Sequence, residues 1–205
     1  FMDAIPFPSA LAVGFGGLWL GTPPNLLFVP DRNHDVKADE EIEVGLTGWG
    51  IQDRHEILNS FIWGPDGWLY GCHGVFTRSQ VGKPIGEGVI FKAGDPFPTS
   101  IKAEDPQYID GGVWRYHPTK DRFEVVAHGF SNPWGIDWDD KGQLFASMCV
   151  IPHIFHVING GIYHRQSGRH INQYVYDDIK TIATHRHRLH NTCAGAEVCN
   201  VDSEG

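Results

Sequence analysis

The chain is poor in cysteine, methionine and basic side chains. Its 205 residues include 4 Cys and 2 Met, and Asp plus Glu outnumber Lys plus Arg by 25 to 16. Four cysteines are too few for a disulfide-stapled scaffold, and no Cys-x-x-Cys-His run is present that would attach a c-type haem to this chain. A net charge of −9 offers no basic face, so we do not expect nucleic-acid binding.

A membrane span is not predicted either. Residues 7–29 carry no charged side chain, but Gly16-Gly17 and Pro23-Pro24 break this run into short pieces. A spanning helix needs about 20 continuous apolar residues. No basic stretch precedes the run, so it does not read as a signal peptide. Because the chain begins in strand-like sequence, we expect it to be a piece of a longer protein.

The residues that are abundant indicate a β-rich fold with many turns. Gly 25, Pro 13 and 7 Trp fit short aromatic strands joined by tight turns. Ile42, Val44 and Leu46 alternate with polar residues, which is the period-2 pattern of a strand with one buried face. The sequence therefore predicts an all-β protein.

A four-stranded unit recurs along the chain. One pattern is a strand, a Gly-containing turn and a strand with an aromatic residue beside a Leu; it occupies residues 10–22, 61–72 and 135–148. A second pattern falls between these hairpins, at 25–49, 112–130 and, in part, 154–163. Four-stranded units at this spacing are typical of β-propeller blades, and about 2.5–3 such blades are visible. A β-sandwich with coincidental turns remains the alternative.

Antiparallel strand order sorts the loops onto two ends of such blades. The hairpin turns share one end, while the loop at 50–59 and a long loop insertion at 73–111 share the other. Function tends to lie where loops are elaborated on a rigid scaffold. We assign residues 1–170 to a partial propeller. Residues 171–205 are expected to form a short helix at 175–187 and an irregular tail.

The most informative stretch is 53–70, where the polar residues Asp53, Arg54, His55 and Glu56 precede the hairpin NSFIWGPDGWLY. From His55 onward it resembles the His…GPDG-x-LY segment of the quinoprotein glucose/sorbosone dehydrogenases. More widely, the chain is similar to the propeller domain of large bacterial proteins described as membrane-bound dehydrogenases. The segments that carry this similarity are PPNLLFVPDRNHDVKAD (23–39), NSFIWGPDGWLYGCHGVFTR (59–78), HGFSNPWGIDWDDKGQLF (128–145) and GGIYHRQSGRH (160–170).

The resemblance implies a six-bladed parent propeller that binds pyrroloquinoline quinone (PQQ). It also implies export to the periplasm or beyond, with membrane association, a sugar or alcohol as substrate, and a c-type haem domain elsewhere in the parent protein as a partner. By this resemblance His55 is the general base, with Asp53 beside it. The interval from His55 to Asp66 is one residue longer than the family's usual pattern.

The resemblance also implies a cofactor contact at Asn132, although Ser131 stands where the family has Arg. Arg54 and Arg78 are candidates for binding an anionic cofactor or substrate. Solvated arginines are the alternative. Trp134 is a candidate for stacking on a flat ligand, and a Trp packed at a blade junction is the alternative.

A separate acidic segment could bind calcium. Asp31, Asn33, Asp35 and Asp39 stand at positions 1, 3, 5 and 9 of a loop, as oxygen ligands do in calcium loops. Position 6 is Val36 where such loops have Gly, so a polar Asx-type turn is the default interpretation. No other metal site is predicted, because the histidines toward the C-terminus lack the spacing and company of a zinc site.

Two functions follow from these patterns. The first is an exported PQQ-dependent sugar or alcohol dehydrogenase propeller in which a His base accepts the hydroxyl proton. The second is a non-catalytic propeller module that binds a protein or polysaccharide partner within a multidomain, haem-containing protein.

Overall fold

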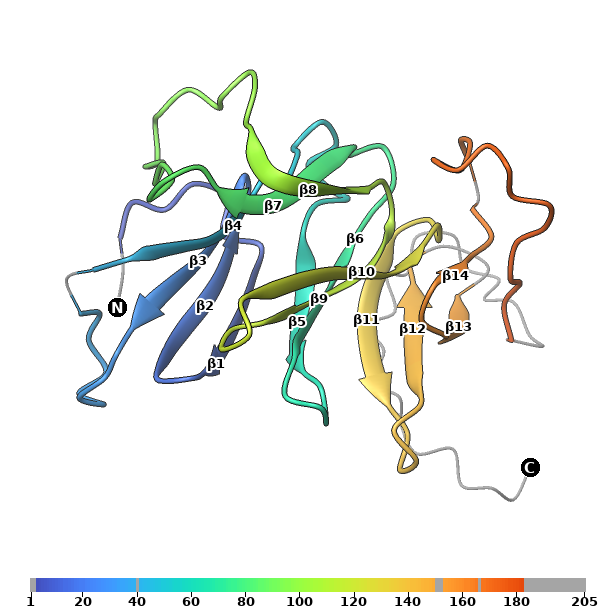
Figure 1. Ribbon diagram of the computed structural model, residues 1–205, viewed down its shortest axis with the longest axis horizontal. Helices are drawn as coiled ribbons and strands as arrows, with labels where there is room; N and C mark the ends of the chain where they lie inside the picture. Colours follow the sequence, from blue (N-terminus) through green and yellow to red (C-terminus); the bar gives the residue numbers. More distant parts are fainter. Residues whose placement is uncertain (1–2, 40, 150–152, 166, 183–205) are drawn as a thin grey trace.

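The computed structural model describes residues 3–39, 41–149, 153–165 and 167–182. This part of the chain forms fourteen β-strands and contains no helix (Figure 1). In chain order the strands are β1 (Ala10–Gly14), β2 (Gly17–Thr22), β3 (Asn25–Pro30), β4 (Glu43–Thr47), β5 (Asn59–Trp63), β6 (Leu69–His73), β7 (Ser79–Pro84), β8 (Ala103–Ile109), β9 (Gly112–His117), β10 (Arg122–His128), β11 (Pro133–Trp138), β12 (Leu144–Met148), β13 (Ile154–Val157) and β14 (Gly161–Ile162).

The strands build three sheets whose order follows the predicted repeat. β1 to β4 form one antiparallel meander, and β5, β6, β9 and β10 form a second. β11, β12 and β13 form a third, and the short β14 pairs in parallel with β10. The predicted all-β class and the hairpins expected at 10–22, 61–72 and 135–148 are confirmed. The described residues do not close into a ring.

The β5–β6 turn has the tight geometry that Pro-Asp-Gly predicts. Gly67 N donates to Gly64 O at 3.0 Å. Gly67 has a φ of +80°, a backbone conformation that would be strained in a residue with a side chain. The Asp66 carboxylate accepts the Tyr70 hydroxyl at 2.9 Å and lies 3.3 Å from Arg115 Nη1. Asp66 therefore fixes its own turn to the neighbouring strand β9.

The segment 73–111 differs from the long loop that the sequence predicts. It contains β7 and β8, which pair with each other, and β7 joins the edge of the first sheet through Thr47 and Gly82. Gly48 permits this approach, since its φ is +102° and a Cβ there would lie 2.0 Å from Gln80 O. β8 has a mostly polar sequence without apolar alternation, so its strand structure depends on hydrogen bonds to β7 rather than on a pattern visible in the chain.

The rest of the insertion, residues 85–102, folds back along the first sheet. Val89 O accepts a hydrogen bond from Asn25 Nδ2 at 2.8 Å, and Ala93 N donates to Ala4 O at 2.7 Å. Asn25 begins β3, so this loop returns to the end of the sheet from which the β4–β5 loop also leaves.

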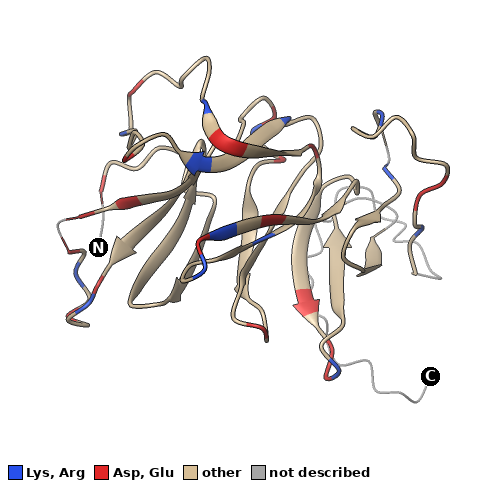
Figure 2. Ribbon diagram, in the orientation of Figure 1, with Lys and Arg blue, Asp and Glu red and all other residues tan. Residues whose placement is uncertain are grey.

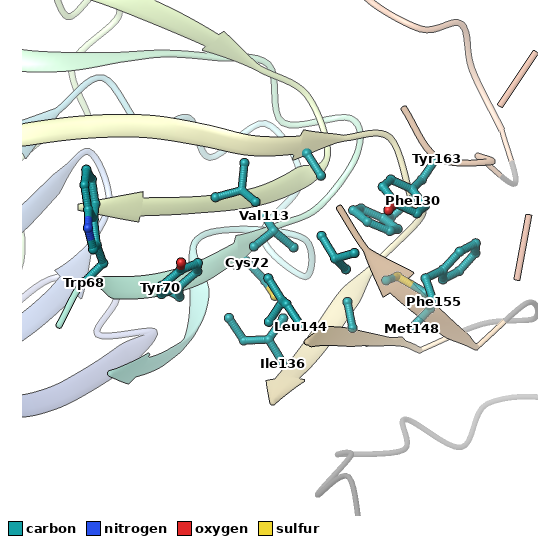
Figure 3. Close-up of a cluster of buried hydrophobic side chains, with 14 residues drawn as sticks. Trp68, Tyr70, Cys72, Val113, Phe130, Ile136, Leu144, Met148, Phe155 and Tyr163 are labelled. Carbon is teal, nitrogen blue, oxygen red and sulfur yellow. The ribbon is translucent and has the colours of Figure 1, made fainter. Parts of the chain in front are cut away.

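The second sheet lies between the first and the third, with an apolar core on each side (Figure 1). The core toward the third sheet is shown in Figure 3, where Tyr163 stacks on Phe130 at 4.4 Å between ring centroids. The core toward the first sheet is rich in tryptophan and leucine and includes Trp19, Leu26, Leu46, Trp49, Leu58, Leu69, Trp114 and Tyr116. Burying a large apolar side chain contributes roughly 1.5–3 kcal/mol, so these two cores are the main support for the loops at the sheet ends.

The helix predicted at 175–187 is wrong for the part that the structure describes, residues 175–182. Ile179 instead forms a parallel bridge with Tyr163. Its N–H and C=O bond to backbone groups on either side of Tyr163, at 2.8 and 2.9 Å, so they are not available for helical hydrogen bonds. Residues 183–205, with the rest of that helix and the predicted tail, lie outside the described residues.

Charged side chains are absent from β1, β2, β5, β6 and β12 and gather in the turns and on strands such as β7, β8 and β10 (Figure 2). Within the described residues, no helix has the length and apolar character needed to cross a membrane.

Candidate functional site

The loops that connect β4 to β5, β6 to β7 and β10 to β11 lie together at one end of the sheets, which we call the loop end. Gly74 N donates to Glu56 O at 3.1 Å and so joins the first of these loops to the second. Val75 N donates to Ser131 O at 3.1 Å and joins the second to the third. The opposite end, called the turn end, holds the β5–β6 turn with Asp66. The predicted positions of the 50–59 loop and of the hairpin turns are thus confirmed. The insertion is not confined to the loop end, because Lys83 and Gly86 line a cavity together with Pro118 of the β9–β10 turn.

Asp53 and His55 lie on the β4–β5 loop at the loop end. Asp53 N donates to Thr77 Oγ1 at 3.3 Å, and Thr77 Oγ1 donates to Asp53 O at 3.2 Å, so the loop is fixed against the β6–β7 connection. Asp53 Oδ1 accepts the backbone N–H of His55 at 2.9 Å, as in an Asx turn. Asp53 therefore holds the His55 backbone, while His55 itself is exposed.

Glu56, the next residue, is a candidate that the sequence interpretation did not select. Its backbone is packed against Gly74, where a Cβ would lie 2.5 Å from Glu56 Cβ. Glu56 Oε2 is buried and has no hydrogen-bond partner among the described residues. Burial and, second, the negative charge of Asp53 raise the pKa of Glu56 to about 7. Such a carboxyl group can accept or release a proton near neutral pH.

A buried ion pair lies close enough to influence Glu56. Arg165 Nη1 donates to Asp110 O at 2.8 Å, and its Nη2 lies 3.4 Å from Asp110 Oδ2. Both side chains are about 5% exposed or less. Asp110 Oδ1 accepts the Phe76 N–H at 3.0 Å, and Arg78 Nε lies 3.7 Å from Asp110 Oδ2. The guanidinium groups of Arg78 and Arg165 thus share the one carboxylate of Asp110, so these three side chains together carry a net charge of +1. We call Asp53, Glu56, Asp110 and Arg165 the loop cluster.

The other predicted cofactor contacts also lie at the loop end. Asn132 Oδ1 is buried without a partner among the described residues. Trp134, near the start of β11, is 37% exposed. The Arg54 guanidinium lies 4.9 Å from the centroid of the Phe7 ring, a cation–π contact. These residues share the loop end with His55, although no hydrogen bond or ion pair between described residues joins them to it.

Two cavities open beside the loop cluster. One, of about 320 Å³, is lined by Arg78 and by parts of the β4–β5 loop and the insertion, residues 48–52 and 97–101. The second, of about 300 Å³, is lined by residues that include Asp110, His128, Arg165 and His170. Burial, and then the charge of His170, lowers the pKa of His128. Among the described residues, neither lining includes His55.

A larger cavity of about 660 Å³ lies at the turn end, away from the loop cluster. Lys83 Nζ donates to the Tyr116 hydroxyl at 3.1 Å, Tyr116 donates to Asp121 Oδ1 at 2.6 Å, and Lys83 pairs with Asp121. Burial and the nearby Glu43 raise the pKa of Tyr116 to about 12, and burial lowers that of Lys83. These polar groups satisfy one another, so the network fastens β7 to the β9–β10 hairpin.

The acidic segment 31–39 forms the polar turn that was the default interpretation. Each predicted calcium ligand accepts a backbone N–H of this turn at 2.9 to 3.1 Å: Asp31, Asn33, Asp35 and Asp39. In the part of the chain that the structure describes, no group of three or more His, Cys, Asp or Glu side chains is placed to hold a metal ion.

The chain belongs to the family described as "Domain of unknown function (DUF7133)", whose model matches residues 1–200. No protein of curated function matches the chain. Among solved structures, it is similar to a protein from Thermus thermophilus described as a "putative oxidoreductase (glucose dehydrogenase)". That likeness has a TM-score of 0.36 and 19% sequence identity, and it covers 85% of this chain and 68% of the other.

Proposed function

We propose that the chain is part of an exported, quinoprotein-like dehydrogenase propeller that oxidises a sugar or an alcohol at its loop end. Its three sheets are consecutive blades in this proposal. The sequence resemblance at 55–70 supports it, together with one structural observation. The loop that carries His55 also carries Glu56, a partly buried carboxyl group with a pKa of about 7.

Oxidation of an alcohol to a carbonyl compound releases one proton from oxygen and one hydride from carbon. His55 is the proposed base for the proton, because the ring nitrogen of a neutral imidazole can accept it. Asp53 positions His55 by binding its backbone N–H. Glu56, one residue further along, is the second group on this loop that can hold the proton.

PQQ, when bound, would supply the acceptor for the hydride. Its carboxylates require cationic partners, and the loop end offers the exposed guanidinium group of Arg54. Trp134 exposes part of its ring to cover a flat ligand. Asn132 Oδ1 lacks a donor that a ligand would provide. The charge of these residues therefore suits PQQ. A c-type haem domain of the same protein is the proposed acceptor of the electrons.

The test is dye reduction by the full-length parent protein supplied with PQQ and calcium, over a panel of sugars and alcohols. We expect His55→Asn to lower kcat by about 100-fold or more, since a positioned general base contributes roughly 10²–10⁴-fold. His34→Asn, a matched change in the exposed 31–39 turn, leaves the rate unchanged. Absence of both dye reduction and PQQ binding in the unaltered protein would rule the proposal out.

A non-catalytic binding module is the second candidate, and an apolar surface on the first sheet favours it. Leu11, Val13 and Phe15, on or next to β1, are 62%, 74% and 47% exposed. Exposed apolar side chains that cluster on one strand often mark a contact with another protein or domain. Under this proposal, charged substitutions at Leu11 and Val13 abolish partner binding while the protein remains folded.

A further inference from the structure

We propose that the cavity beside Arg78 binds a carboxylate carried on a sugar ring, so that the substrate is an acidic saccharide such as a uronic acid. As a substrate assignment this rests on the function proposed above, whereas the binding itself does not. The cavity lies between the β4–β5 loop and the folded-back part of the insertion, beside the loop cluster.

The lining of this cavity selects for negative charge. Its described lining includes no Asp or Glu, and Arg78 is the one charged side chain in it. The chain as a whole carries a net charge of −9, whereas the charge in this lining is positive. The remaining polar side chains are amides and hydroxyls, which can donate hydrogen bonds to oxygen: Gln52, Gln80, Thr99 and Ser100.

Arg78 is available to a ligand. Its side chain is 73% exposed, and its described ion pair is the 3.7 Å approach of Nε to Asp110. Asp110 is already bound by the buried Arg165, so Arg78 is not neutralised by it. No hydrogen bond to a described residue engages the Nη groups of Arg78. A guanidinium group with this edge free can bind a carboxylate through two parallel hydrogen bonds.

The size and walls of the cavity suit a single sugar ring. Its volume of about 320 Å³ is at the lower limit for ligand pockets, which span roughly 300–1,000 Å³. Phe97, which is 37% exposed, and Tyr108 provide apolar surfaces for the C–H face of a pyranose. Trp49 also lines the cavity, and its buried ring packs against His73 and Trp114.

The first experiment compares D-glucuronate, D-glucose and PQQ as ligands of the unaltered protein, by calorimetry at low and high salt. We expect glucuronate to bind about tenfold more tightly than glucose, because only its carboxylate can accept charge-assisted hydrogen bonds from the Arg78 guanidinium group. Its affinity should fall at high salt, as expected for a charge on an exposed arginine. Equal affinities for the two sugars, or binding of PQQ alone, would overturn the proposal.

The second experiment changes the arginine. Arg78→Gln should lower the affinity for glucuronate about tenfold or more and leave the affinity for glucose unchanged. Arg122→Gln, at another exposed arginine that lies on β10, is the matched control and should alter neither. An unchanged affinity in a folded Arg78→Gln protein contradicts the proposal. If that variant does not fold, the comparison of sugars in the unaltered protein still decides it.

The two proposals fail in different ways. Glucuronate binding that depends on Arg78, without dye reduction by any substrate, would leave the binding site standing and remove the dehydrogenase. Dye reduction with neutral sugars, without measurable glucuronate binding, would keep the dehydrogenase and remove the acidic substrate.

Discussion

Two acidic segments of similar composition, 31–39 and 53–56, have opposite environments in the folded chain. In the first, the side-chain oxygens accept the backbone N–H groups of their own turn. In the second, Asp53 does the same for His55, but Glu56 is packed against Gly74 and its Oε2 has no partner among the described residues. Composition alone therefore does not distinguish the two segments. They differ in the packing against Gly74, which removes water from the Glu56 carboxyl group.

The ion pairs next to the two segments differ in the same way. Arg32 lies 3.7 Å from Glu43 beside the turn, and these side chains are 70% and 55% exposed. Arg165 and Asp110 at the loop end are almost completely buried. An exposed pair of this kind contributes roughly 0–1 kcal/mol, whereas removal of one partner of a buried pair costs about 3–5 kcal/mol.

The largest expected effect is on the free energy of unfolding, when each of these two ion pairs is broken in a separate variant. Arg165→Met leaves the Asp110 carboxylate buried with weaker compensation, so the free energy of unfolding should fall by about 3 kcal/mol. Arg32→Met should change it by less than about 0.5 kcal/mol. Urea unfolding of both variants measures the difference. Equal losses would show that the loop end is no more dependent on its ion pair than the turn is.

Glu56→Gln tests the carboxyl group itself. The pKa of Glu56 is about 7 in the folded chain against 4.5 as its ordinary value, so the folded state keeps this proton longer than the unfolded state. The stability of the protein should therefore fall as the pH rises from 4.5 to 7 and stay lower above that window. After a discount for partial exposure, the loss is about 1–2 kcal/mol. Glu56→Gln should abolish it and be more stable than the parent at pH 8.

Asp35→Asn is the matched control for this measurement, because Asp35 belongs to the exposed turn and Asn can still accept the Lys37 N–H. Thermal unfolding at pH 4.5, 6 and 8 suffices, since 1 kcal/mol corresponds to roughly 2–4 °C in a chain of this size. A pH profile of Glu56→Gln that parallels that of the parent would mean that Glu56 has an ordinary pKa and is solvated.

Local patterns predicted most of the strands, because hairpins with Gly-containing turns and alternating apolar residues are decided within a few residues. The sequence did not predict β7 and β8. The polar sequence of β8 becomes a strand through pairing with β7, and β7 itself joins the first sheet through Thr47 and Gly82. The segment 175–182 has helix-compatible residues, yet the bridge between Ile179 and Tyr163 determines its structure. Both errors are cases in which a contact distant in sequence outweighed local preference.

The candidate site was predictable in its location and not in its chemistry. Strand order placed His55 at the loop end, but the burial of Glu56 depends on residues far along the chain. Asp110 and Arg165 are 55 positions apart, and no local sequence pattern around either residue predicts that they pair. One signal was present: the interval from His55 to Asp66 is one residue longer than in the quinoprotein pattern, so Glu56 stands at the usual interval.

The smallest effect concerns the turn that serves as the comparison. Val36 is exposed and has φ +65°, a conformation that strains a β-branched residue by roughly 1–3 kcal/mol. Glycine removes the strain but adds about 0.5–1 kcal/mol of chain entropy to the unfolded state, so Val36→Gly should raise stability by about 0.5 kcal/mol. Val89→Gly, at an exposed valine whose φ is not positive, should lower stability by a similar amount.

If both variants lose stability in urea unfolding, the hydrogen bonds to the turn oxygens do not hold residue 36 in that conformation. The 31–39 turn could then no longer serve as the hydrogen-bonded reference with which the 53–56 loop is compared.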